Sequence, residues 1–192
     1  IFKGDETGYQ YSRYSNPTVD MFEKRLALLD KSEECFATAS GMSAVFGSMM
    51  CQLKTGDHVL SSSALFGSCR YIVKEILPRF GIEVSFVNGK NFSEWEEGIK
   101  ENTKIIFFET PSNPCLDLID LEAVCKLAKS KNVTTIIDNI FASPVLQCPK
   151  EFGADIIIYS GTKHIDGQGR TMGGAILTSK QFKEETLKPF LR

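Results

Sequence analysis

Residues 155–163 read Asp-Ile-Ile-Ile-Tyr-Ser-Gly-Thr-Lys. An almost uninterrupted apolar run of this length is typical of a strand that is buried on both faces of a sheet. The runs at Lys104–Glu109 and Thr134–Asp138 have the same character. Amphipathic runs of helix length separate these segments. The sequence therefore predicts an α/β fold with a mostly parallel sheet, flanked by helices and joined by right-handed crossovers.

The hydrophobic pattern predicts strands and helices that alternate along the chain. The expected strands are Cys35–Thr38, His58–Ser62, Glu83–Val87, Lys104–Glu109, Thr134–Asp138, Asp155–Ser160 and Ala175–Thr178. The expected helices are Thr18–Leu29, Met42–Leu53, Ser68–Phe80, Phe92–Glu101 and Leu121–Lys131. Pro17 suits the first helical position, and Asn16 is a suitable cap for that helix. No linker, repeat or low-complexity tract interrupts the pattern, which indicates one domain.

The composition limits the class of protein. The 192 residues carry a formal net charge of -2 at pH 7 and are 42% hydrophobic, which suits a globular domain and favours neither nucleic acid nor an anionic membrane as a partner. No run approaches the roughly 20 apolar residues of a membrane span, and no export leader is visible, so we expect a cytoplasmic protein. The cysteines and histidines match no zinc template, which predicts reduced thiols and no metal site. Because the chain starts at Ile1 and stops at Arg192 within a helix-like run, we expect both ends to be cut.

Lys163 is the first candidate for chemistry. Ligands of an open α/β sheet bind beyond the carboxyl ends of its strands, and Lys163 follows the strand expected at 155–160. A lysine beside a partly desolvated pocket has a destabilised ammonium form and a more nucleophilic amine. The alternative is a lysine whose stem packs while its head reaches solvent.

Asp138 is a second candidate, and it favours a chemical role for Lys163. It ends the strand expected at 134–138, and an isolated buried carboxylate is costly. The ring of pyridoxal phosphate (PLP) would resolve that cost, because the carboxylate keeps the pyridine nitrogen protonated and the pyridinium acts as an electron sink. Asp138 and Lys163 together therefore predict a PLP site. The alternative for Asp138 is to cap a following turn.

The polar segments at neighbouring strand ends suit the rest of such a cofactor. A Ser-Gly pair that opens a helix leaves backbone N–H groups free to hold a phosphate, although many such turns use Ser-Gly for geometry alone. Phe66 follows another strand and could stack on a flat ring, or belong to the core. The candidates for the phosphate site are Ser40, Gly41, Met42, Ser160 and Thr162.

Five segments of the chain resemble the Cys/Met-metabolism family of PLP-dependent enzymes. They are YSRYSNPT at 11–18, ASGMSA at 39–44, ETPSNP at 109–114, DNIFASP at 138–144 and SGTKHIDGQGR at 160–170. The resemblance implies PLP-dependent fold type I, with an aspartate-aminotransferase-like large domain at residues 18–192. Residues 1–17 would form an arm that reaches a neighbouring subunit, and the family's small C-terminal domain would be absent from this chain.

The same resemblance implies roles for individual residues. Lys163 would carry the cofactor covalently and shuttle protons, while Asp138 would hold the pyridine nitrogen. Asn113 would contact the ring hydroxyl, and the segments around Gly41 and Thr162 would bind the phosphate. Tyr11 and Arg13 match residues that reach the phosphate of a neighbouring subunit, which implies a homodimer or homotetramer with shared active sites.

Two segments narrow the expectation within the family. SALFGSC at 63–69 and HIDGQGRTMGG at 164–174 resemble the branch that contains the O-succinylhomoserine and O-acetylhomoserine sulfhydrylases. That branch implies γ-replacement on an O-acyl-homoserine by a sulfur nucleophile, giving homocysteine in methionine biosynthesis. The sequence departs from most relatives at Phe66, where they carry a tyrosine, and at His164, where a tyrosine is common after the lysine.

Several other functions stay open at this point. Cystathionine γ-synthase and the cystathionine or methionine γ-lyases share the cofactor residues, so the sequence does not separate them from a sulfhydrylase. A nucleotide-binding domain is disfavoured, because Met172 stands where Gly167 and Gly169 would need a third glycine. An inactive, truncated scaffold with the same fold is the non-enzymatic alternative.

Overall fold

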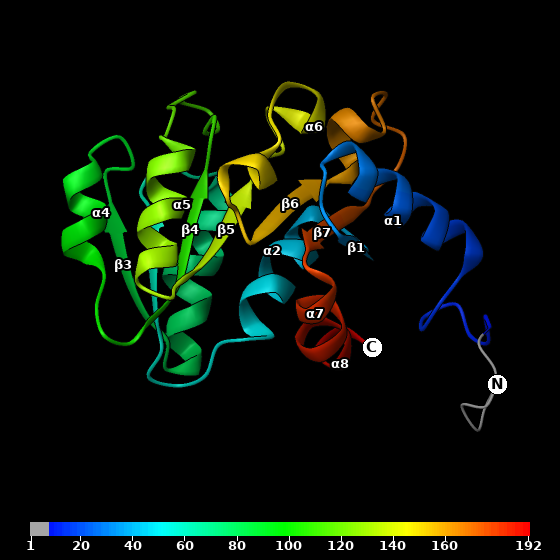
Figure 1. Ribbon diagram of the computed structural model, residues 1–192, viewed down its shortest axis with the longest axis horizontal. Helices are drawn as coiled ribbons and strands as arrows, with labels where there is room; N and C mark the ends of the chain where they lie inside the picture. The colour runs from blue at the N-terminus through cyan, green and yellow to red at the C-terminus, as the bar shows by residue number, and fades with distance from the viewer. Residues whose placement is uncertain (1–7) are drawn as a thin grey trace.

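The computed structural model describes residues 8–192, in which a seven-stranded sheet has helices on both faces (Figure 1). The strand order is β1-β7-β6-β5-β4-β2-β3. The strands are β1 (Glu34–Thr38), β2 (His58–Ser62), β3 (Glu83–Val87), β4 (Thr103–Glu109), β5 (Thr134–Asp138), β6 (Ile156–Ser160) and β7 (Gly174–Thr178). Every strand predicted from the sequence is present, with ends that differ by no more than one residue.

The helices connect these strands and cover both faces of the sheet. The α-helices are α1 (Pro17–Leu29), α2 (Gly41–Met50), α3 (Gly67–Tyr71), α4 (Phe92–Gly98), α5 (Leu121–Ser130), α6 (Ser143–Leu146), α7 (Lys180–Phe182) and α8 (Lys188–Leu191). The π and 3-10 segments are η1 (Ile72–Ile76), η2 (Leu77–Phe80), η3 (Pro149–Phe152), η4 (Gly161–Ile165) and η5 (Lys183–Leu187). Asn16 caps α1 as expected, because its side chain accepts hydrogen bonds from the N–H groups of Thr18 and Val19.

The helix boundaries correct the sequence prediction in several places. The helix expected over 68–80 is α-helical only to Tyr71 and then continues as π and 3-10 turns. Pro78 lies in the last of these turns and has no N–H to donate to a regular helix. Two other helices end three residues early, α2 at Met50 and α4 at Gly98.

The sheet is mostly parallel, as expected, with one exception. Strands β2 to β6 pair in parallel, whereas β7 is antiparallel to both β6 and β1. The connection from β6 to β7, residues 161–173, contains only the short turn η4 and no crossover helix. Without a crossover the chain returns beside β6 in the opposite direction.

Alternation along the buried strands divides the core into two layers. Ile106, Phe108 and Ile137 pack with α1, α4 and α5 on one face, and Ile105, Phe107 and Ile136 pack with α2 and α3 on the other. Side chains two residues apart on a strand share a face. Residues that follow Phe107 and Ile136 by two positions therefore project toward α2 and α3, and these residues are Glu109 and Asp138.

His58 lies at the opposite end of the sheet, at the start of β2, and is fully buried. Its Nδ1 is 2.8 Å from Thr103 Oγ1, an oxygen that also accepts the Lys100 N–H. The tautomer of His58 decides which atom donates in this bond, and Nε2 has no partner among the described residues. Burial, aided by the charge of Lys100, lowers the pKa of His58 to about 4.

We expect His58 to make the fold sensitive to acid. The unfolded imidazole takes up a proton near pH 6.5 and the folded one only near 4, so stability is lost as the pH falls through this window. Between pH 7 and 4, urea denaturation should show wild type losing roughly 3 kcal/mol more than His58→Asn. His164→Asn, a change at an exposed histidine, is the control and should match wild type. An identical pH profile for His58→Asn and wild type would contradict the prediction.

Candidate active site

The carboxyl ends of β4, β5 and β6 bring together residues that are far apart in the sequence. Glu109 pairs with Asp138 in the β4–β5 ladder, and Asp138 pairs with Ile158 in the β5–β6 ladder. Ser160 follows Ile158 by two positions, so the strand alternation places it on the same face as the two carboxylates. This face of the sheet is covered by α2 and α3, and the site lies there, at the carboxyl ends of the strands.

Asp138 is a buried carboxylate with few partners. Its Oδ1 accepts the N–H of Ile140 at 3.1 Å, and its Oδ2 lies 3.7 Å from the Cys69 thiol of α3. Burial raises the pKa of Asp138 to about 6. In the described part of the chain no cationic side chain forms an ion pair with it. A flat cation, such as a pyridinium ring, is a suitable partner for a buried carboxylate that has no ion pair.

The first turn of α2 forms a cradle against the end of β6. Ser40 caps the helix through a 3.1 Å bond from the Ser43 N–H. The N–H groups of Gly41 and Met42 have no acceptor within residues 8–192. A Cβ at Gly41 would lie 2.8 Å from the Cβ of Ser160, so only glycine fits at this close approach. Free N–H groups beside a serine hydroxyl suit a phosphate.

Lys163 lies in η4, directly after β6 and three residues after Ser160, the residue against which Gly41 of the cradle packs. Its backbone is not helical (φ -96°, ψ -117°), and its side chain is exposed. The neighbouring Thr162 Oγ1 accepts the Gly173 N–H at 3.2 Å, and Gly161 donates to the Gly173 carbonyl at 2.8 Å. These bonds anchor the base of the loop that presents Lys163.

Phe66 and Asn113 come from the loops after β2 and β4. Phe66 is 42% exposed, so its ring is available to a ligand. Glu109, which the sequence analysis did not select, links the two loops. Its Oε2 accepts the Phe66 N–H at 2.8 Å, which joins the loop after β2 to the end of β4, where the loop that carries Asn113 begins. An acid at the end of a buried strand was the signal that identified Asp138, and the same signal could have identified Glu109.

Tyr11 and Arg13 do not join this cluster. Both are exposed, and the Arg13 guanidinium lies over the rings of Tyr11 and Tyr14, at 5.5 and 4.8 Å from their centroids. The arm that carries them extends from the start of α1, at the end of the molecule opposite α4 (Figure 1). Residues 1–7 of the predicted arm lie outside the described residues.

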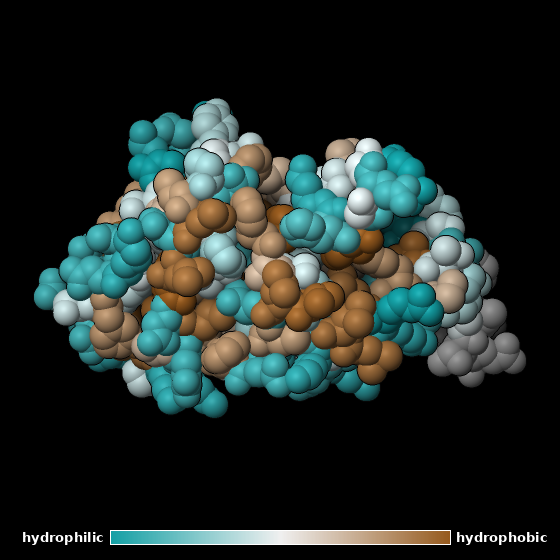
Figure 2. Space-filling model, turned by 90° about the horizontal axis from the view of Figure 1, so that it is seen from above, coloured by the Kyte–Doolittle hydropathy of each residue, from teal (hydrophilic) through white to brown (hydrophobic). Residues whose placement is uncertain are grey.

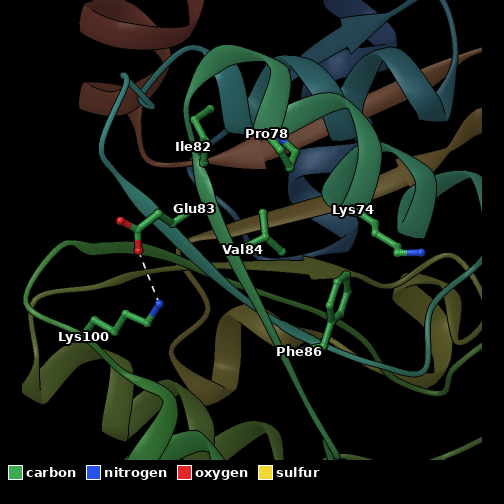
Figure 3. Close-up of a pocket in the computed structure, with 7 residues that line it drawn as sticks. All are labelled: Lys74, Pro78, Ile82, Glu83, Val84, Phe86 and Lys100. Carbon is green, nitrogen blue, oxygen red and sulfur yellow. Dashed lines mark hydrogen bonds and ion pairs between the residues drawn. The ribbon is translucent and has the colours of Figure 1, made fainter.

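A hollow of about 370 Å³ lies beside the edge strand β3, away from this cluster (Figure 3). Lys100 and Glu83 form an ion pair of 3.3 Å along it. Its lining consists of Lys74, Pro78, Ile82, Glu83, Val84, Phe86 and Lys100, which include none of the residues predicted from the sequence. Within residues 8–192 no His, Cys, Asp and Glu side chains gather in a group that could hold a metal ion, and no helix is long and apolar enough to cross a membrane.

Apolar side chains are exposed on the surface above the candidate site. Figure 2 looks onto the molecule from above the carboxyl ends of β4 and β5 and shows apolar surface in the middle of that face. The exposed large apolar residues of the segments that follow these two strands, α6 included, are Leu116, Leu118, Phe141, Val145 and Leu146. Exposed apolar surface of this kind is typical of a contact region with another protein.

Comparison with known proteins agrees with the fold and with a PLP cofactor. A structure assigned as an O-acetylhomoserine (thiol)-lyase from Campylobacter jejuni, which contains N'-pyridoxyl-lysine-5'-monophosphate, matches 95% of this chain and 45% of its own with a TM-score of 0.89 and 36% identity. The fold and the site thus define a PLP-dependent protein of fold type I.

The particular family follows from the sequence comparison. Residues 1–191 match the model of the Cys/Met metabolism PLP-dependent enzymes, and the chain belongs to this family. It is 47% identical over its whole length to an O-succinylhomoserine sulfhydrylase of Mycobacterium tuberculosis, and 41% identical over 96% of its length to an L-methionine gamma-lyase of Fusobacterium nucleatum. It covers 47% of each of these relatives, so the chain spans about half of their length.

Gly41→Ala tests the cradle. The new Cβ would sit 2.8 Å from the Ser160 Cβ, which forces the start of α2 away from β6. Such overpacking costs about 1–3 kcal/mol of stability, and we expect PLP affinity to fall at least tenfold. Gly47→Ala, in the same helix, is the control: its Cβ would meet the movable Leu191 side chain, and PLP affinity should not change. Urea denaturation and PLP titration measure both effects, and equal PLP affinities for the two variants would contradict the prediction.

Proposed function

We propose that this chain is the PLP-binding core of an enzyme that replaces the γ-acyloxy group of an O-acyl-homoserine, succinyl or acetyl, with a sulfur nucleophile. The product would be homocysteine, in methionine biosynthesis. Buried Asp138, which has no cationic partner among the described residues and lies at the same sheet edge as Lys163, is the observation that supports PLP chemistry. The greater identity to the sulfhydrylase than to the γ-lyase supports the replacement reaction.

Lys163 and Asp138 would do most of the chemical work. The exposed amine of Lys163 would bind the cofactor covalently, then remove the Cα proton of the substrate and later return a proton to the product. Asp138 would hold the proton on the ring nitrogen, since a buried carboxylate without a cation gains most from such a partner. When bound, PLP supplies the electron sink for the breaking Cα–H bond.

The remaining candidates would hold and orient the cofactor. The free N–H groups at the start of α2 would bind the phosphate, together with the hydroxyl groups at the end of β6. Phe66 would stack on the ring, and Asn113 would contact the ring hydroxyl. The residues of the phosphate site would be Ser40, Gly41, Met42, Ser160 and Thr162.

Phe66 favours an ester substrate over a thioether. Its ring offers no hydroxyl that could protonate a leaving group. A carboxylate leaves as a weak base with a pKa of about 4, whereas a thiolate has a pKa of about 8.5 and is a poorer leaving group without an acid. The acyloxy group of an acylated homoserine therefore suits a site built around Phe66 better than the sulfur of methionine or cystathionine.

The arm at residues 1–17 supports a shared site. Tyr11 and Arg13 are exposed, and the Arg13 guanidinium contacts the rings of Tyr11 and Tyr14 of the same arm. We propose that they reach the phosphate of a neighbouring subunit in a homodimer or a homotetramer. The apolar residues exposed above the carboxyl ends of β4 and β5 would be covered in such an assembly. Residues 18–192 would then form the large, PLP-binding domain.

Lys163→Ala tests the covalent link. We expect wild-type full-length protein to bind PLP with a visible absorbance band that borohydride removes, leaving an adduct on the peptide that contains Lys163. Lys163→Ala should give no adduct and lose nearly all turnover, because the amine that moves the Cα proton is absent. Mass spectrometry of the reduced protein is the measurement. Lys129→Ala, at an exposed lysine of α5, should keep both properties. A reduced adduct at another lysine in wild type would refute the assignment.

Substrate assays test the type of reaction. With PLP, sulfide and O-succinyl- or O-acetyl-homoserine, full-length protein should release homocysteine and the free acid in equal amounts. With methionine or cystathionine, 2-oxobutyrate should form at least tenfold more slowly, because the departing sulfur finds no acid at Phe66. Faster release of 2-oxobutyrate from either thioether than of homocysteine from both esters would show a γ-lyase instead.

A further inference from the structure

Glu109 is a buried acid that the proposed chemistry does not yet use. It ends the central strand β4, and its side chain is only 2% exposed. Taking a carboxyl group out of water is costly unless hydrogen bonds compensate for it. An apolar residue at this position would fill the space without that cost. The acid therefore needs an explanation beyond packing.

The hydrogen bond of the Glu109 side chain joins two loops. Its Oε2 accepts the Phe66 N–H at 2.8 Å, in the loop after β2. Glu109 itself ends β4, four residues before Asn113, so it stands at the start of the second loop. One side chain thus cross-links the two loops whose residues would hold the cofactor ring, Phe66 at its face and Asn113 at its hydroxyl.

Glu109 also lies next to the carboxylate proposed to hold the ring nitrogen. It pairs with Asp138 in the β4–β5 ladder, and Cys69 of α3 lies near both carboxylates. Burial and the charge of Asp138 raise the pKa of Glu109 to about 7. Two neighbouring buried acids resist carrying two negative charges, so a cation placed at Asp138 would relieve both.

We propose that Glu109 is a positioning residue, which fixes Phe66 and Asn113 relative to each other and thereby sets the orientation of the cofactor ring above Asp138. The proposal rests on the proposed roles of these residues in binding PLP. It assigns Glu109 no contact with the cofactor. Its effect passes through the Phe66 N–H that its carboxylate accepts and through its own place at the start of the Asn113 loop.

Glu109→Gln tests the proposal in the full-length protein, stripped of PLP and titrated with it again. The glutamine amide is uncharged and its NH₂ group cannot accept a hydrogen bond, so the Phe66 N–H loses its charged acceptor. Loss of a hydrogen bond to a charged acceptor predicts a PLP dissociation constant raised at least tenfold. At saturating PLP, the visible circular dichroism per bound cofactor should also fall, because the ring is held less firmly.

Asp57→Asn is the matched control. Asp57 is also a buried carboxylate that accepts a backbone N–H, from Lys54 at 2.8 Å, but it lies before β2 at the other end of the sheet. This variant should lower the unfolding free energy of the cofactor-free protein, yet leave PLP affinity and dichroism as in wild type. Glu109→Asp, which keeps the charge but is one methylene shorter, is the second variant if Glu109→Gln does not fold, and the same losses are expected.

The outcomes separate the alternatives. Weaker PLP binding and weaker dichroism in the Glu109 variants alone would support a positioning role. Wild-type affinity and dichroism in Glu109→Gln, or equal losses in Glu109→Gln and Asp57→Asn, would overturn it while the proposed function stands. A wild-type protein that binds no PLP would contradict the proposed function and the role of Glu109 together.

Discussion

The two-residue alternation of the buried strands β4, β5 and β6 is the constraint on which the rest of the structure depends. Each strand is covered on both faces, so every side chain along it is committed to one of two apolar layers. At the carboxyl ends of these strands, the same alternation continues into polar residues. It brings Glu109, Asp138 and Ser160 to the face covered by α2 and α3, where the N-terminus of α2 and the Cys69 thiol meet them.

Among the described residues, the carboxylates of this site have no cationic partner, and the first N–H groups of α2 have no acceptor. Two buried carboxylates lie side by side on β4 and β5, and burial raises the pKa of each. Against the end of the neighbouring strand β6, the first turn of α2 offers N–H groups that have no acceptor within residues 8–192. A ligand with a cationic ring and an anionic group would satisfy both, and PLP, the cofactor of this family, is such a ligand.

Much of the fold could be predicted from the sequence because it depends on local pattern. The runs that became β4, β5 and β6 are almost wholly apolar, and such runs have few alternatives to a doubly covered strand. The helices were less certain. Pro78 and the packing around it turned one expected α-helix into α, π and 3-10 turns, a difference that depends on neighbours more than on periodicity.

The sequence by itself determined the α/β class, the strand positions and, through the quoted motifs, the family and its cofactor. It also singled out Lys163 and Asp138, because both follow buried strands. Only the tertiary structure showed that Glu109 joins the loops of Phe66 and Asn113, and that Gly41 touches Ser160. The physical reason is that these contacts join residues from separate strands and loops. Their distances are set by sheet register and helix packing, which sequence spacing does not contain.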